Sequence, residues 1–126
     1  MSVTIRHREK PPWTVLSVGG DLDVVGATDL RQAVVAAVAE GSRLLVLDLS
    51  DLDFVDSFGI GAVVGALKRL RQRGGDLALV CPSSRIRRVF ELCDLDRVLE
   101  LHASIDTVAE LSAAGSGRAA SPGMRP

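Results

Sequence analysis

The sequence predicts a single α/β domain with a mixed β-sheet, an opening β-hairpin and about four helices. Two continuously apolar runs, residues 43–49 and 76–81, are typical of central strands that are covered on both faces. Residues 3–8 and 13–18 have the composition of strands and flank the turn-forming segment 9–12, which predicts a hairpin. Segments with helical spacing of apolar residues separate the later strands, and this alternation is typical of an α/β fold.

The first two helices each have an apolar stripe and a glycine near their end. The first stripe consists of Leu30, Ala33, Val34, Ala37 and Val38, and Gly41 is its expected C-terminal cap. The second stripe consists of Ile60, Val63, Val64, Leu67 and Leu70, and Gly74 and Gly75 close it. We expect residues 50–55 to form a loop and the second helix to begin at about Phe58.

The third helix follows Pro82 and two serines that are candidate caps. Its stripe consists of Ile86, Val89, Phe90 and Cys93. A short strand around residues 97–101 and a last helix from Ser104 to about Ala113 complete the predicted domain, which spans residues 1–113. Residues 114–126 have little to bury, so we expect a disordered tail.

Composition excludes several classes of function. The chain has 126 residues and a formal net charge of −1, so its overall charge does not favour binding to nucleic acid or to an anionic membrane. No apolar run has the length of a membrane span, and the first ten residues lack the apolar core of a signal peptide, so we expect a soluble, cytoplasmic protein. Cys81 and Cys93 lack metal-type spacing and are expected to be buried, reduced thiols. The basic residues of the second and third helices are interpreted as solvated faces.

Asp56 and Ser57 stand at the expected start of the second helix. Either side chain could cap the helix by accepting hydrogen bonds from its free N–H groups. A hydroxyl at this position also faces the positive end of the helix dipole, where a phosphate would be well held. The two roles are compatible, and the spacing does not choose between them.

Catalytic and metal sites have little support in the sequence. Ser57 does not lie in a G-x-S-x-G turn, and the two histidines, His7 and His102, fall in or beside predicted strands. The carboxylates between residues 48 and 56 lack the spacing of a calcium-binding loop. We therefore expect no enzymatic activity, no cofactor and no bound metal.

Two segments resemble a STAS domain of the anti-sigma factor antagonist type. Residues 20–23, Gly-Asp-Leu-Asp, are similar to the G-E-[LI]-D motif of that family. Residues 56–60, Asp-Ser-Phe-Gly-Ile, are similar to its D-S-[ST]-G-[LI] motif, which opens the second helix. The resemblance extends over about residues 3–111.

The resemblance implies a protein-binding switch in which Ser57 is phosphorylated. Asp56 would be its acidic neighbour, and Asp23 would be a second acid close to the phosphorylation site. The implied partners are a serine kinase that doubles as an anti-sigma factor and a metal-dependent serine phosphatase. The unphosphorylated protein would bind the kinase and free a sigma factor. The alternative is a STAS binding module of a stress-sensing or transporter-associated complex, in which Ser57 only caps the helix.

Glycines and one aromatic residue are expected to shape the partner surface. Gly59 and Gly61 belong to a stretch of small residues that would leave the helix start open to a partner. Gly61 and Gly65 lie one turn apart, so they either form a bare helix face or pack tightly on the sheet. Phe58 replaces the usual Ser or Thr of the family, and it either anchors a partner or folds back over the neighbouring loop.

Two further departures from the family pattern concern helix ends. Gly26 stands where the family commonly has an N-cap serine. Asp94 stands where the family often has a helix-ending glycine, and aspartate tolerates a left-handed backbone conformation better than most residues.

Overall fold

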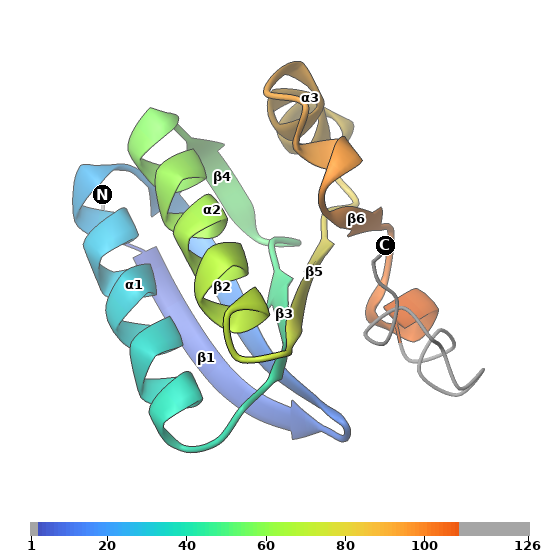
Figure 1. The fold of residues 1–126 in the computed structure, drawn as a ribbon. Helices are drawn as coiled ribbons and strands as arrows, with labels where there is room; N and C mark the ends of the chain where they lie inside the picture. The colour runs from blue at the N-terminus through green and yellow to red at the C-terminus, as the bar shows by residue number, and fades with distance from the viewer. Residues whose placement is uncertain (1–2, 109–126) are drawn as a thin grey trace.

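The computed structural model describes residues 3–108, which form a six-stranded mixed sheet with helices packed against it (Figure 1). The elements, in chain order, are β1 (Val3–Lys10), β2 (Trp13–Leu22), α1 (Val24–Ala39), β3 (Leu44–Asp48), β4 (Leu52–Val55), α2 (Ser57–Arg71), β5 (Asp76–Val80), α3 (Ser84–Leu92), the 3-10 helix η1 (Leu95–Arg97) and β6 (Glu100–His102). A further helical turn occupies residues 105–108. The part of the predicted last helix beyond Val108, and the predicted tail, lie outside the described residues.

The sheet confirms the predicted mixture of antiparallel and parallel pairing. β1 and β2 form the opening antiparallel hairpin, from Val3 opposite Gly20 to Lys10 opposite Trp13. The strand order is β1-β2-β3-β5-β6, and the pairs β2–β3, β3–β5 and β5–β6 are parallel. β4 lies off the path and pairs in parallel with the last residues of β2.

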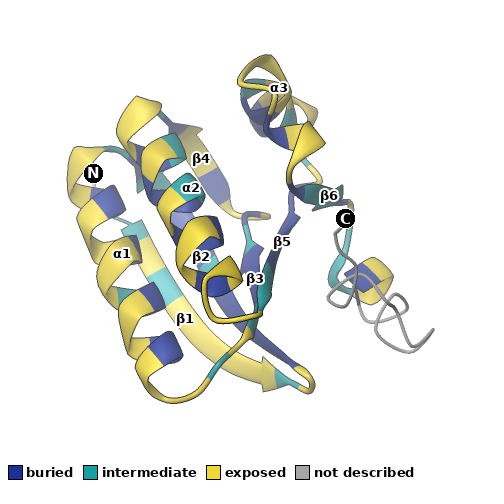
Figure 2. Cartoon of the chain, in the orientation of Figure 1, coloured by how far each residue is buried: buried dark blue, intermediate teal, exposed yellow. Residues whose placement is uncertain are grey.

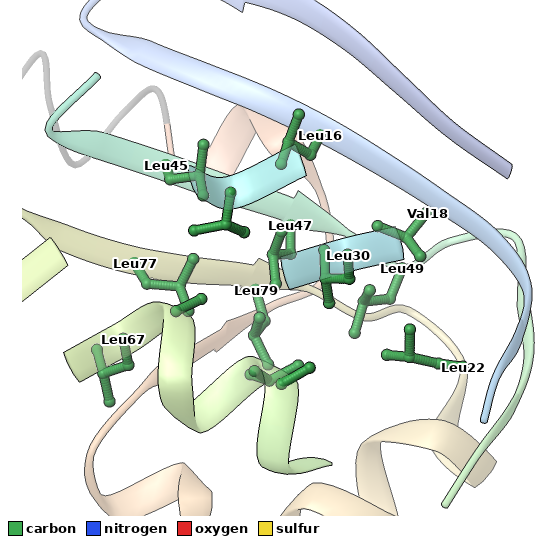
Figure 3. Packing of buried hydrophobic residues seen from close by; sticks show 14 of the residues in the cluster. Leu16, Val18, Leu22, Leu30, Leu45, Leu47, Leu49, Leu67, Leu77 and Leu79 are labelled. Atoms are coloured by element: carbon green, nitrogen blue, oxygen red, sulfur yellow. The ribbon is translucent and has the colours of Figure 1, made fainter. Parts of the chain in front are cut away.

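The central strands are buried on both faces, as their continuous apolar runs predicted. Helices α1 and α2 lie side by side over one face, and both turn buried residues towards the strands (Figure 2). Figure 3 shows the leucines that fill the space between them, which include Leu16, Leu30, Leu45, Leu47, Leu67, Leu77 and Leu79. On the opposite face, Val108 of the last helical turn packs in a second cluster with Trp13, Val15, Val46, Ala78 and Val80.

Residues 50–55 were expected to form a loop, and this prediction is wrong because they contain β4. The strand pairs with β2 only at Gly20–Leu22, and its register shifts between Gly20 and Asp21. Leu52 and Val55 are buried, whereas Asp53 and Phe54 are exposed. Buried positions three apart do not show the two-residue alternation that reveals a strand in a sequence.

Helix α2 packs through smaller residues than predicted. It begins at Ser57, and its buried residues are Gly59, Ala62, Val63, Ala66, Leu67 and Leu70. Ile60 and Val64, which were assigned to the core stripe, are only half-buried. Three of the six buried residues are glycine or alanine, which let the helix approach the sheet closely.

The predictions for Gly41, Asp94 and the cysteines have mixed outcomes. Gly41 follows α1 with a φ of +105°, as a helix-ending glycine should, and Asp94 follows α3 with a φ of 59°. The two cysteines differ in burial. Cys81 is buried, and burial raises the pKa of its thiol. The prediction of a buried thiol is wrong for Cys93, which is the exposed C-cap residue of α3.

Candidate functional site

The first turns of α1 and α2 lie at the same edge of the sheet. α1 follows the end of β2 after Asp23, and α2 follows the end of β4 after Asp56. Leu22 and Val55 are partners in the parallel pairing of β2 with β4, and the Asp56 N–H donates to the Leu22 carbonyl oxygen at 3.3 Å. Because the two strands end together, the helices that follow them begin together.

Asp56, not Ser57, caps α2. Its Oδ1 accepts hydrogen bonds from the N–H groups of Phe58 at 2.9 Å and Gly59 at 3.2 Å. Ser57 is the first residue of the helix and is exposed. Within residues 3–108, the Ser57 hydroxyl makes no hydrogen bond. The open choice between Asp56 and Ser57 as cap is therefore resolved, and the hydroxyl stands free in solvent.

Asp23 caps α1 in the same way. Its Oδ1 accepts a hydrogen bond from the Gly26 N–H at 2.9 Å. The placement of Gly26 at the N-cap is therefore wrong: it lies inside the helix and is buried. A Cβ atom at this position would lie 2.4 Å from the Asp21 carbonyl oxygen, so the close approach of α1 to the end of β2 requires glycine.

Gly59 and Gly61 have opposite surroundings. Gly59 is buried, and a Cβ atom there would lie 2.3 Å from the Leu22 carbonyl oxygen and 2.8 Å from a methyl carbon of Val55. Gly61 and Gly65 are exposed, and a Cβ atom at either position would have no neighbour within 4 Å. Tight packing thus accounts for Gly59, whereas of the two alternatives for Gly61 and Gly65 the structure shows the bare helix face and not packing on the sheet.

Exposed apolar side chains gather at the ends of the elements that meet at this edge. Phe58, in the first turn of α2, is 53% exposed. Three further exposed residues were not singled out from the sequence: Val24 and Val25 in the first turn of α1, and Phe54 in β4. The exposure of the two valines could have been predicted from their position directly after the Asp23 cap, before the buried stripe of α1 begins.

The same edge carries several carboxylates. Asp23 and Asp56 are held at the helix starts, Asp21 and Asp53 belong to β2 and β4, and the Asp51 carbonyl oxygen accepts a hydrogen bond from the Gly20 N–H at 3.1 Å. Carboxylates therefore lie at the starts of both helices and on the two strands that precede them. A phosphate on Ser57 would make this edge more negative, while the helix N-terminus would still favour an anion there.

Neither histidine lies beside Ser57 in the fold. His7 lies in β1 opposite Leu16 and pairs with Glu9 at 2.8 Å. His102 lies in β6, at the other end of the strand order, and its Nε2 is 3.0 Å from Oε1 of Glu100. In residues 3–108, no group of three or more His, Cys, Asp or Glu side chains could hold a metal ion. None of the helices in that range is both long enough and apolar enough to span a membrane.

Comparison with known proteins agrees with the resemblance seen in the sequence. The STAS domain family model matches residues 3–108. The anti-sigma-B factor antagonist of Listeria monocytogenes is 32% identical over 101 residues, which cover 80% of this chain and 88% of that protein. A crystal structure of an anti-sigma factor antagonist from Mycobacterium paratuberculosis has a TM-score of 0.74 and 29% identity, covering 86% of this chain and 92% of that one. The anti-sigma factor antagonist SpoIIAA in its unphosphorylated form has a TM-score of 0.58 and 25% identity, covering 75% of this chain and 97% of its own.

The two glycines of α2 predict opposite effects of the same substitution. Gly59→Ala would force α2 away from the end of β2, so we expect a loss of about 1–3 kcal/mol in the free energy of unfolding. Gly61→Ala meets only solvent, so we expect a gain of about 0.5–1 kcal/mol from better helix propensity. Urea unfolding of both variants beside the wild type measures the two effects. Equal effects of both substitutions would contradict the packing described for this helix.

Proposed function

This chain belongs to the STAS domain family, and we propose that it is an anti-sigma factor antagonist controlled by phosphorylation of Ser57. In its unphosphorylated state it binds an anti-sigma factor serine kinase in the cytoplasm and thereby frees a sigma factor. Phosphorylation of Ser57 releases the kinase, and a metal-dependent serine phosphatase resets the switch. The chain itself acts by binding and catalyses no reaction.

The observation that carries this proposal is the free, exposed hydroxyl of Ser57 at the start of α2. Because Asp56 supplies the cap, a phosphate on Ser57 does not remove a hydrogen bond on which the helix depends. The modified side chain points into solvent next to the positive end of the helix dipole. The names of the relatives, which are anti-sigma factor antagonists, support the same function.

Electrostatics supplies the switch without a change of fold. A phosphate adds about −1.5 to −2 charges at neutral pH. Like unit charges about 6 Å apart repel by about 3 kcal/mol at an effective dielectric near 20, before screening by salt. Since about 1.4 kcal/mol is a tenfold change in affinity, a fraction of this repulsion is enough to release a partner that carries its own negative charge at the contact.

The partner surface consists of the residues around Ser57 that are open to solvent. Phe58 is an exposed aromatic side chain, and Gly61 leaves the next turn of the helix bare. A partner can therefore place its backbone close to α2 while it encloses the Phe58 ring. Asp23 and Asp56 cap the two helices and contribute negative charge to the surface that a partner contacts.

Phosphorylation is predicted to occur on Ser57 alone. Incubation with the cognate anti-sigma kinase and ATP should add one phosphate, and Ser57→Ala should abolish it, as measured by intact-mass and peptide-mapping mass spectrometry. Ser84→Ala is the matched control, because Ser84 is also the exposed first residue of a helix and follows its own N-cap, Ser83. A phosphate mapped to Ser83 or Ser84 would contradict the proposal. Kinase binding without any phosphorylation would favour the alternative of a constitutive STAS binding module.

Phe58 is predicted to anchor the kinase. Its ring is half-exposed, so Phe58→Ser should change the melting temperature little while it weakens kinase binding, since a buried aromatic anchor contributes about 2 kcal/mol or more. Val35→Ser is a suitable control, because Val35 is 45% exposed on α1 and lies outside the first turn. Isothermal titration calorimetry measures both affinities. A lower melting temperature with unchanged affinity would show that Phe58 only fills local space.

A further inference from the structure

A second surface lies at the opposite end of α2 from Ser57. The last turns of the helix and the segment after η1 border a shallow hollow of about 530 Å³ that is largely open to solvent. It is lined by Val64, Leu67, Lys68, Arg71, Gln72 and Val98. Lys68 is eleven residues beyond Ser57, or roughly 16 Å along the helix axis at the rise of an α-helix. The hollow is thus separate from the phosphorylation site.

The walls of the hollow are held in place by Arg71. Its Nη2 donates a hydrogen bond to the Val98 carbonyl oxygen at 2.7 Å, and its Nε donates to Oδ1 of Asp76 at 3.3 Å. These bonds tie the end of α2 to the segment after η1 and to the start of β5. The hollow is therefore formed before any ligand arrives, which lowers the entropic cost of binding.

The lining combines an apolar wall with an uncompensated positive charge. Val98 is 42% exposed, Val64 is half-buried and Leu67 is buried. Lys68 is exposed at the rim, and within residues 3–108 it has no hydrogen-bond or ion-pair partner. Among residues 3–108, no acidic side chain lines the hollow, and the charge of Arg71 is already matched by Asp76.

We propose that this hollow binds a small amphipathic anion: an organic molecule with an apolar body and a single carboxylate, sulfonate or phosphate group. The body lies against Val64, Leu67 and Val98, and the anionic group pairs with Lys68. The volume falls within the range of about 300–1,000 Å³ that is usual for small-molecule sites. This function does not depend on phosphorylation of Ser57.

Octanoate and octan-1-ol are a matched pair of probes, because they share an apolar chain and only octanoate is charged. Titration of the full chain with each, followed by ¹H–¹⁵N correlation spectra below the concentration of micelle formation, measures binding residue by residue. We expect saturable shifts at the amides of residues 64–72 and 98 with octanoate, and weaker shifts with octan-1-ol.

Variants separate the charge from the apolar wall. Lys68→Gln should raise the dissociation constant for octanoate by about two- to fivefold, the range of an exposed ion pair, and leave that for octan-1-ol unchanged. Arg69→Gln is the control, because Arg69 is an exposed neighbour that does not line the hollow. Val98→Asp should abolish octanoate binding, because it places a charged carboxylate in the wall against which the apolar chain lies.

Four results of the ligand titrations would each overturn the proposal. These are the absence of saturable shifts with octanoate, equal binding of the two probes, shifts centred elsewhere on the chain, and equal effects of Lys68→Gln and Arg69→Gln. Shifts at the same amides on raising the protein concentration without octanoate would identify a second copy of the chain as the occupant, and would also overturn it.

Discussion

The junction between the ends of β2 and β4 determines the geometry of the whole candidate site. Leu22 and Val55 pair across it, the Leu22 carbonyl oxygen accepts the Asp56 N–H, and Gly59 packs directly on the same carbonyl group. A side chain at position 59 would separate α2 from the sheet and remove Asp56 from its place. The start of α2, its cap and the exposure of Ser57 follow from this contact, and the approach of Gly26 to the Asp21 carbonyl group sets the start of α1 in the same way.

Asp56 caps α2 and Ser57 does not, and this separation of roles explains how a phosphorylation switch can act without a change of fold. A cap contributes about 1 kcal/mol to helix stability, so a serine that was both cap and phosphate acceptor would couple modification to the stability of α2. Here the aspartate makes the capping bonds and the serine makes none among residues 3–108. We therefore infer that a phosphate on Ser57 changes the charge of the surface that a partner contacts at this edge more than it changes the fold.

The sequence predicted the buried parts of the fold better than the edge where the candidate site lies. Residues 43–49 and 76–81 were correctly identified as central strands, because burial on both faces requires an unbroken apolar run. β4 was missed because it pairs with one strand over a few residues and has a shifted register. Gly26 was misplaced because only the structure shows which carboxylate reaches the helix N–H groups. The exposure of Cys93 and Phe54 depends on which elements pack nearby, which local spacing does not encode.

The affinity of the cognate anti-sigma kinase for the unphosphorylated and the Ser57-phosphorylated chain is the most direct test of the central claim. Calorimetric titrations at low and high salt should show binding at least about tenfold weaker for the phosphorylated chain, with a smaller difference at high salt because salt screens surface charge. The two forms should have closely similar melting temperatures. Equal affinities, or a loss of affinity that accompanies a large fall in melting temperature, would contradict an electrostatic switch on an unchanged fold.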